Sequence, residues 1–221
     1  MNSHVTYDSL KSSEIFDKKI NILIWKRSLL TEHILAAEKI LHNEPDFRFS
    51  QLMRPAEVKN ALIKKIGSNQ KLSILFDDIS NLIKDFCLLF DSKRAWLRLD
   101  AIDRPMCPRF HVDHVKCRLV TTYFGPATQW LPSNLVDRTK LGHGNQGLPD
   151  EKSGLFAKST DIKQLSKGHV ALLKGESWDG NNGSGLVHRS PSAIDNYKRL
   201  YMTIDLEEFY LNIHKKTPKC C

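Results

Sequence analysis

His111 and Asp113 are separated by one residue, and a second histidine, His188, follows 75 residues after Asp113. Two imidazoles and one carboxylate are the ligand set of the facial triad, which holds Fe(II) by one face and leaves the other coordination positions open. In a β-strand, residues i and i+2 point to the same side, so His111 and Asp113 could bind one ion from a single short segment. The ordered set predicts that His111, Asp113 and His188 are metal ligands and form the catalytic centre.

Arg199 follows His188 by 11 residues, on a predicted strand. A planar guanidinium binds a carboxylate through two parallel N–H groups. Arg199 is therefore the candidate for binding the far carboxylate of an acidic co-substrate such as 2-oxoglutarate, whose other end could chelate the metal. Tyr123 or Thr121, on an earlier predicted strand, could add a hydrogen bond to that co-substrate. Arg189 competes for the carboxylate, but as the strand neighbour of His188 it should face away from the metal.

Other residues of metal-binding type lie near the motif or in the loops. His114 should point to the opposite face from the residue before it, whereas His143 and His169 read as ordinary polar histidines. Cys107 and Cys117 flank the motif, so a Cys/His zinc site is conceivable there. The chain lacks the tight C-x-x-C pairs of structural zinc modules, which disfavours that alternative.

The bulk composition is that of a globular protein of 221 residues, with 41% hydrophobic and 26% charged residues. No apolar run approaches the roughly 20 residues that span a bilayer, and residues 1–19 contain no signal-peptide core. We therefore expect a cytoplasmic protein. Its five cysteines, an odd number, favour the reduced state over a disulfide framework. Two of them, Cys220 and Cys221, are expected to belong to a frayed tail.

The net charge is +8, and most of the basic excess lies in residues 91–221. A basic cleft attracts anionic ligands, from a dicarboxylate to nucleic acid. The chain has no run of five or more Lys or Arg and no recognisable nucleic-acid motif, so a generally basic surface is favoured over nucleic-acid binding. The expected partners are a small-molecule co-substrate and a substrate that the sequence leaves open, with no membrane.

The first half of the chain predicts mainly helices. Residues 19–25 are a short apolar run typical of a buried strand. Helices are expected over 28–42 and 55–66, and a third from 72 to 90, where apolar residues recur at i, i+3 and i+4. Residues 1–18 are polar and without periodicity, so no regular structure is expected there.

The second half predicts strands. Alternating or β-branched segments bounded by glycine and proline are typical of strands, and they occur at residues 95–100, 115–124, 168–174, 186–188 and 199–206. Residues 131–167 are polar and long enough to be a lid over the metal site or a surface insertion. Helices followed by strands favour an α+β fold, with the helices on one side of a mainly antiparallel β structure.

The segment 111–206 resembles the double-stranded β-helix of Fe(II)/2-oxoglutarate-dependent oxygenases, through the order of its His-x-Asp pair, distal histidine and arginine. The whole chain is similar to a bacterial family of uncharacterised function, through 107–113 (CPRFHVD) and 185–191 (GLVHRSP). The resemblance implies one domain, 1–221, with a jelly-roll, cupin-like core at 93–221 and a mainly helical part at 1–92 packed on it. It also implies Fe(II) and 2-oxoglutarate, but supplies no substrate.

Three functional hypotheses follow. The first is an Fe(II)- and 2-oxoglutarate-dependent oxygenase, a hydroxylase or demethylase. The second is a non-catalytic metal-binding protein that holds Zn(II) in metal homeostasis, for which a carboxylate-binding Arg199 would be superfluous. The third is a hydrolase or isomerase of cupin type, which would need His114 or His169 as a further ligand.

Overall fold

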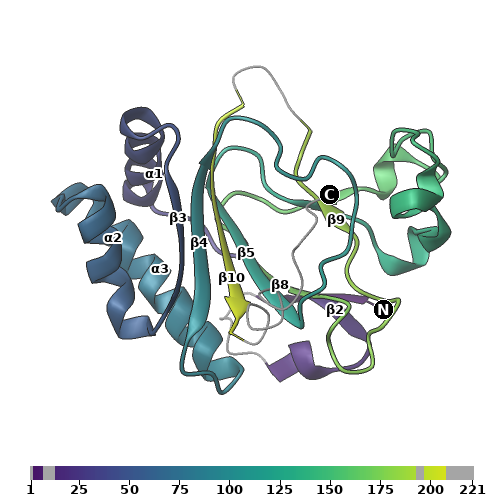
Figure 1. The fold of residues 1–221 in the computed structure, drawn as a ribbon, viewed down its shortest axis with the longest axis horizontal. Coiled ribbons are helices and arrows are strands. Elements are labelled where there is room, and N and C mark those ends of the chain that lie inside the picture. Colours follow the sequence, from purple (N-terminus) through teal and green to yellow (C-terminus); the bar gives the residue numbers. More distant parts are fainter. Residues whose placement is uncertain (1, 7–12, 193–196, 208–221) are drawn as a thin grey trace.

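The computed structural model describes residues 2–6, 13–192 and 197–207. A layer of helices covers one face of a large sheet, and a second, smaller sheet lies on the other side (Figure 1). The α+β class expected from the sequence is confirmed. The tail cysteines Cys220 and Cys221 and part of the turn before Arg199 lie outside the described residues.

The large sheet has seven strands in the order β1-β2-β8-β5-β10-β4-β3, and every neighbouring pair except β1–β2 is antiparallel. Its strands are β1 (Asn2–Thr6), β2 (Ile20–Trp25), β3 (Arg48–Met53), β4 (Ala95–Ile102), β5 (Cys117–Phe124), β8 (Val170–Lys174) and β10 (Arg199–Leu206). The small sheet has the order β7-β6-β9, formed by β6 (Gln129–Trp130), β7 (Lys163–Gln164) and β9 (His188–Arg189).

Strand β10 shows how the sheet separates apolar from polar side chains. Leu200, Met202 and Ile204 belong to the core between the sheet and the helices. The alternate residues therefore point to the opposite face, toward the small sheet, and these are Arg199, Tyr201, Thr203 and Asp205. All four residues are polar, so the polar side chains of β10 lie on the side of the sheet that the helices do not cover.

The helical layer consists of α1 (Thr31–Asn43), α2 (Val58–Ile66) and α3 (Gln70–Leu89). Helix α3 begins at Asn69, whose Oδ1 accepts the Lys71 backbone N–H at 2.9 Å. The expected apolar stripe is buried against the sheet from Leu72 to Phe86, whereas Phe90, also expected in it, is the half-buried C-cap. The buried residues of the helix are Leu72, Leu75, Phe76, Ile79, Leu82, Ile83, Phe86 and Cys87. The helix expected over 28–42 begins later than predicted, because α1 starts at Thr31, after Leu30. The second expected helix starts as a single 3-10 turn, Pro55–Glu57, before α2.

Two edge strands were not expected from the sequence. Strand β1 lies in residues predicted to be irregular, and β3 follows α1 where no element was predicted. Both lie at the edges of the sheet and pair on one side only. Their polar, weakly alternating sequences become strands because a neighbouring strand offers backbone partners.

The long polar segment 131–167, which we call the insertion, contains short regular elements. It contains four 3-10 turns, Ser133–Leu135, Arg138–Lys140, Gly142–Asn145 and Ser159–Asp161, in addition to β7. Leu131 and Leu155 are buried in a small core of their own with Phe110 and Val187. Figure 1 shows the insertion, in green, as a compact lobe beyond β9. Among the described residues, no helix has the length and apolar character that a membrane crossing requires.

Candidate metal centre

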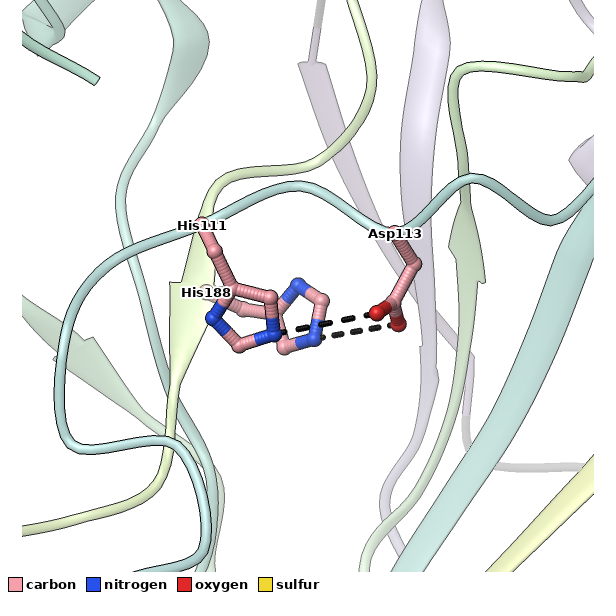
Figure 2. A group of neighbouring side chains, drawn as sticks. All are labelled: His111, Asp113 and His188. Atoms are coloured by element: carbon pink, nitrogen blue, oxygen red, sulfur yellow. Dashed lines mark ion pairs between the residues drawn. The ribbon is translucent and has the colours of Figure 1, made fainter. Parts of the chain in front are cut away.

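His111, Asp113 and His188 bring their side chains together, although two of them are 77 residues apart in the chain. One ligand atom from each lies within 4.8 Å of the others. Nε2 of His188 is 3.3 Å from Asp113 Oδ2, and Nε2 of His111 is 3.7 Å from Oδ1 of the same carboxylate. Figure 2 shows both rings pointing toward this carboxylate. No other such group of potential metal ligands occurs among the described residues.

The backbone brings the two histidines side by side. The His111 N–H donates to the His188 carbonyl at 3.0 Å, and the His188 N–H donates back at 3.0 Å, so the two residues form an isolated antiparallel bridge. The Asp113 carbonyl accepts the Glu176 N–H at 2.9 Å, after the turn that follows β8. The expected strand through His111 and Asp113 is thus reduced to one bridge.

Each imidazole has its Nδ1 occupied by a backbone carbonyl. Nδ1 of His111 lies 3.0 Å from the Arg109 oxygen, and Nδ1 of His188 lies 3.0 Å from the Leu186 oxygen. A carbonyl oxygen only accepts, so each Nδ1 carries a proton, and Nε2 is the nitrogen of each ring that faces Asp113. The same arrangement orients histidines that bind metals in proteins.

Arg118 of β5 links the large sheet to this centre. Its Nη1 donates to Asp113 Oδ2 at 2.8 Å, while Nε and Nη2 donate to the two oxygens of Asp205 at 2.7 and 2.8 Å. Sequence reasoning missed both residues. Their signal is present only in the strand register, which pairs Arg118 with Asp205 across β5 and β10.

The electrostatics of the centre favour the protonation states that metal ligands need. Burial is the main cause that lowers the pKa of His111 to about 4, and the neighbouring His188 adds to the effect. For Asp113, burial alone would raise the pKa, but Arg118 and the two histidines outweigh it and hold the pKa well below its usual range. His111 is therefore neutral and Asp113 ionised at neutral pH.

Arg199 is fully buried, with 1% of its surface exposed. Its Nη2 donates to the hydroxyls of Thr122 and Thr128, both at 3.0 Å, and its guanidinium carbon lies 3.9 Å from the centre of the Tyr201 ring. Among the described residues, no carboxylate pairs with this cation. Burial lowers the pKa of Arg199, as expected for a charge with neutral partners.

Tyr201 packs against Arg199, on the sheet face that also carries Arg118. Burial raises the pKa of its phenol, and the charges of Arg199, Arg118 and Asp113 all act on that pKa.

Arg189, the competing arginine, has its own carboxylates. Its Nη1 donates to Asp150 at 3.2 Å and to Glu151 at 2.9 Å, and its Nε donates to Gln129 at 2.9 Å. A guanidinium held in this way has little capacity left for a further carboxylate.

The structure corrects the expected position of Tyr123 and Thr121. The Tyr123 hydroxyl donates to Asp78 of α3 at 2.7 Å, on the helix-covered face. The Thr121 hydroxyl is buried with no partner among the described atoms, opposite Met202. A shift of register between β5 and β10 places Leu200 opposite Phe124 but Tyr201 opposite Thr122. The hydroxyl that reaches Arg199 therefore belongs to Thr122, one residue away from each candidate.

The remaining histidines and cysteines do not join the cluster. His114 is exposed, and Nδ1 of His169 lies 3.3 Å from its own turn at Ser166 N. Cys117 is buried on the helix side of β5, and burial raises the pKa of its thiol. The conceivable Cys/His zinc site is therefore absent from the described part of the chain.

A family model described as "protein of unknown function (DUF1826)" matches residues 8–205. The chain belongs to this family. A comparison with curated proteins found no match.

Among solved structures, the rice dioxygenase for auxin oxidation is similar over 84% of this chain and 73% of its own, with 10% identity and a TM-score of 0.51. Two further structures have lower TM-scores: dioxygenase for auxin oxidation 1 of Arabidopsis thaliana, in a binary complex with 2-oxoglutarate (0.47, 7% identity, 93% and 92% covered), and a prolyl-4-hydroxylase of Pseudomonas putida (0.44, 10% identity, 87% and 94% covered). The rice enzyme and this chain share a fold. The expected resemblance to oxygenases and to an uncharacterised family is confirmed.

Proposed function

We propose that this protein is an Fe(II)- and 2-oxoglutarate-dependent oxygenase. The observation that carries the proposal is a buried arginine, Arg199, whose partners among the described residues are all neutral. It lies on the sheet face whose Arg118 holds Asp113 of the cluster of His111, Asp113 and His188. A metal carrier needs the cluster but has no use for a buried cation with neutral partners.

His111, Asp113 and His188 would hold the metal. Both Nε2 atoms face the carboxylate of Asp113, which is ionised, so the three side chains would present two nitrogens and one oxygen to a single cation. Three protein ligands leave coordination positions vacant, whereas structural zinc centres use four. When bound, Fe(II) would supply the redox chemistry by which O₂ is activated and 2-oxoglutarate is oxidised.

Arg199 would bind the far carboxylate of 2-oxoglutarate. Thr122 and Thr128 fix the guanidinium from one side and the Tyr201 ring packs against its face, so the fork is ordered before a ligand arrives. A carboxylate would neutralise a charge that burial otherwise penalises. Of the other buried arginines nearby, Arg118 is saturated by Asp113 and Asp205, and Arg189 by Asp150 and Glu151.

We also propose a more specific fold for the β-sheet core. The two sheets pack their facing sides into one apolar cluster, to which the large sheet contributes Val120, Ala171 and Leu173 and the small sheet Trp130. We take this two-sheet core, 93–221, as a double-stranded β-helix of jelly-roll, cupin-like type, completed by the strands and helices of 1–92 in one domain.

Anaerobic titration tests the proposal. Fe(II) followed by 2-oxoglutarate should produce a weak visible charge-transfer band, with one equivalent of each bound. Binding of Fe(II) or Zn(II) without any binding of 2-oxoglutarate would overturn the oxygenase and favour the metal-binding alternative. The primary substrate is not needed for this measurement.

A further inference from the structure

One side chain of the insertion, Asp150, makes polar contacts with both histidine-bearing segments. Its carboxylate is 4% exposed, although the insertion as a whole lies at the surface as a lobe beside β9 (Figure 1). None of its contacts is with His111, Asp113 or His188 themselves.

The first connection leads to His111. Asp150 Oδ2 accepts the Phe110 backbone N–H at 2.8 Å, and Oδ1 lies 3.2 Å from Arg109 Nε. The Arg109 carbonyl is the group that holds Nδ1 of His111 at 3.0 Å. Asp150 thus grips the two residues that precede the histidine, one of which orients its ring.

The second connection leads to His188. Arg189, the next residue in β9, donates from Nη1 to Asp150 Oδ2 at 3.2 Å. Its guanidinium also lies 4.3 Å from the centre of the Phe110 ring, so it packs on the residue that Asp150 holds from the other side. One carboxylate therefore ties together the segments that carry the two imidazoles.

Asp150 is itself fixed within the insertion. The Ser153 hydroxyl donates to the Asp150 carbonyl at 3.0 Å, and the Leu155 N–H donates to that hydroxyl at 3.3 Å. Leu155 is 1% exposed in the small core that also contains Phe110 and Val187. The carboxylate is therefore placed by packing, and two arginines balance its charge.

We propose that Asp150 is a positioning residue for the metal centre: the insertion uses it to hold the His111 and His188 segments at the separation at which both imidazoles reach one ion. This inference rests on the proposed metal site. Outer partners of metal ligands commonly contribute about 10- to 100-fold to metal affinity without touching the metal. The coupling is reciprocal, so metal binding must stabilise the contacts of Asp150 in return.

The test compares Asp150→Asn with Asp161→Asn, using Co(II) as the probe. Asp161 lies in the same insertion and accepts the Lys158 backbone N–H at 2.9 Å, so its replacement also weakens a carboxylate–backbone bond. Asp150→Asn should weaken Co(II) binding by about 10- to 100-fold and alter the visible spectrum of the bound ion. Asp161→Asn should do neither. If Asp150→Asn lowers thermal stability but leaves Co(II) affinity and spectrum unchanged, Asp150 is structural only and the inference is overturned.

Hydrogen exchange on the native chain provides a second test that needs no variant. Adding Co(II) should slow exchange at the Phe110 amide and across residues 148–155, where Asp150 is anchored. Unchanged exchange in a protein that binds Co(II) would contradict the positioning role. A native chain that binds no divalent metal would instead refute the proposed function, so the two failures are distinct. If residues 131–167 were instead a mobile lid, their backbone amides would all exchange quickly in the absence of metal.

Discussion

Arg118 and His188 approach the same oxygen of Asp113. The arginine donates to Oδ2 at 2.8 Å, and Nε2 of His188 lies 3.3 Å from it, while Oδ1 faces His111. The carboxylate orientation is therefore set by a residue of the large sheet and not by the histidines alone. Because Asp205 holds Arg118 by two bonds, the position of Asp113 depends on a strand far away in the sequence.

Replacing Asp205 by Asn should destabilise the protein and disturb the centre. Asp205 is 1% exposed, and its loss would leave Arg118 with Asp113 as its remaining carboxylate partner, so we expect a cost of about 1–3 kcal/mol, below that of a fully unpaired buried charge. Urea unfolding of the variant should show a loss of this size. The control is Asp103→Asn, which replaces an exposed carboxylate just after β4 and should change the free energy of unfolding little. A loss under ~1 kcal/mol for Asp205→Asn would mean that Arg118 finds another partner.

Replacing His188 by Ala should abolish stoichiometric binding of Fe(II) or Co(II). Only two of the three side chains would remain, and the carboxylate would lose its nearest imidazole. Calorimetric titration measures the loss, and circular dichroism checks that the fold is retained. His114→Ala removes an exposed histidine next to the motif and should leave binding intact. Full affinity in His188→Ala would remove this residue from the ligand set.

Arg199→Lys should weaken 2-oxoglutarate binding by roughly 10- to 100-fold, since a compact ammonium replaces a fork that matches a carboxylate. Metal affinity should stay near that of the native chain, because Arg199 bonds to hydroxyls and not to the metal-ligand cluster. Lys198→Ala removes an exposed charge from the preceding position and is the matched control. An unchanged dissociation constant for 2-oxoglutarate in Arg199→Lys would exclude this arginine as its anchor.

Gly175→Ala should weaken metal binding through the backbone. A Cβ at this position would lie 2.1 Å from the Val115 carbonyl oxygen and 2.6 Å from that of Asp113, so the segment carrying the ligand must move. Gly180→Ala is an informative control, because its φ of +78° is costly for alanine but a Cβ would touch nothing within 4 Å. Both variants should lose stability, but only Gly175→Ala should lose metal affinity. Equal metal affinities in the two would show that the Asp113 segment adapts.

The sequence by itself determined the features that depend on neighbours along the chain. The i, i+3, i+4 stripe of α3 and the alternation of β10 follow from local periodicity, and both are present in the structure. The chemical types also come from the sequence: His111, Asp113 and His188 stood out as a ligand set before their side chains were seen together.

Only the tertiary structure decided which partners these residues have. Thr122, and not Thr121 or Tyr123, reaches Arg199 because the pairing of β5 with β10 places Thr122 opposite Tyr201, on the face of Arg199, whereas Tyr123 lies on the helix-covered face. Arg189 is not available for a co-substrate carboxylate because it already pairs with Asp150, 39 residues away in the chain. Such choices depend on how strands distant in sequence come to lie side by side, and local periodicity carries no information about them. The sequence shows which side chains could bind a metal and a carboxylate, whereas long-range strand pairing sets which of them come together.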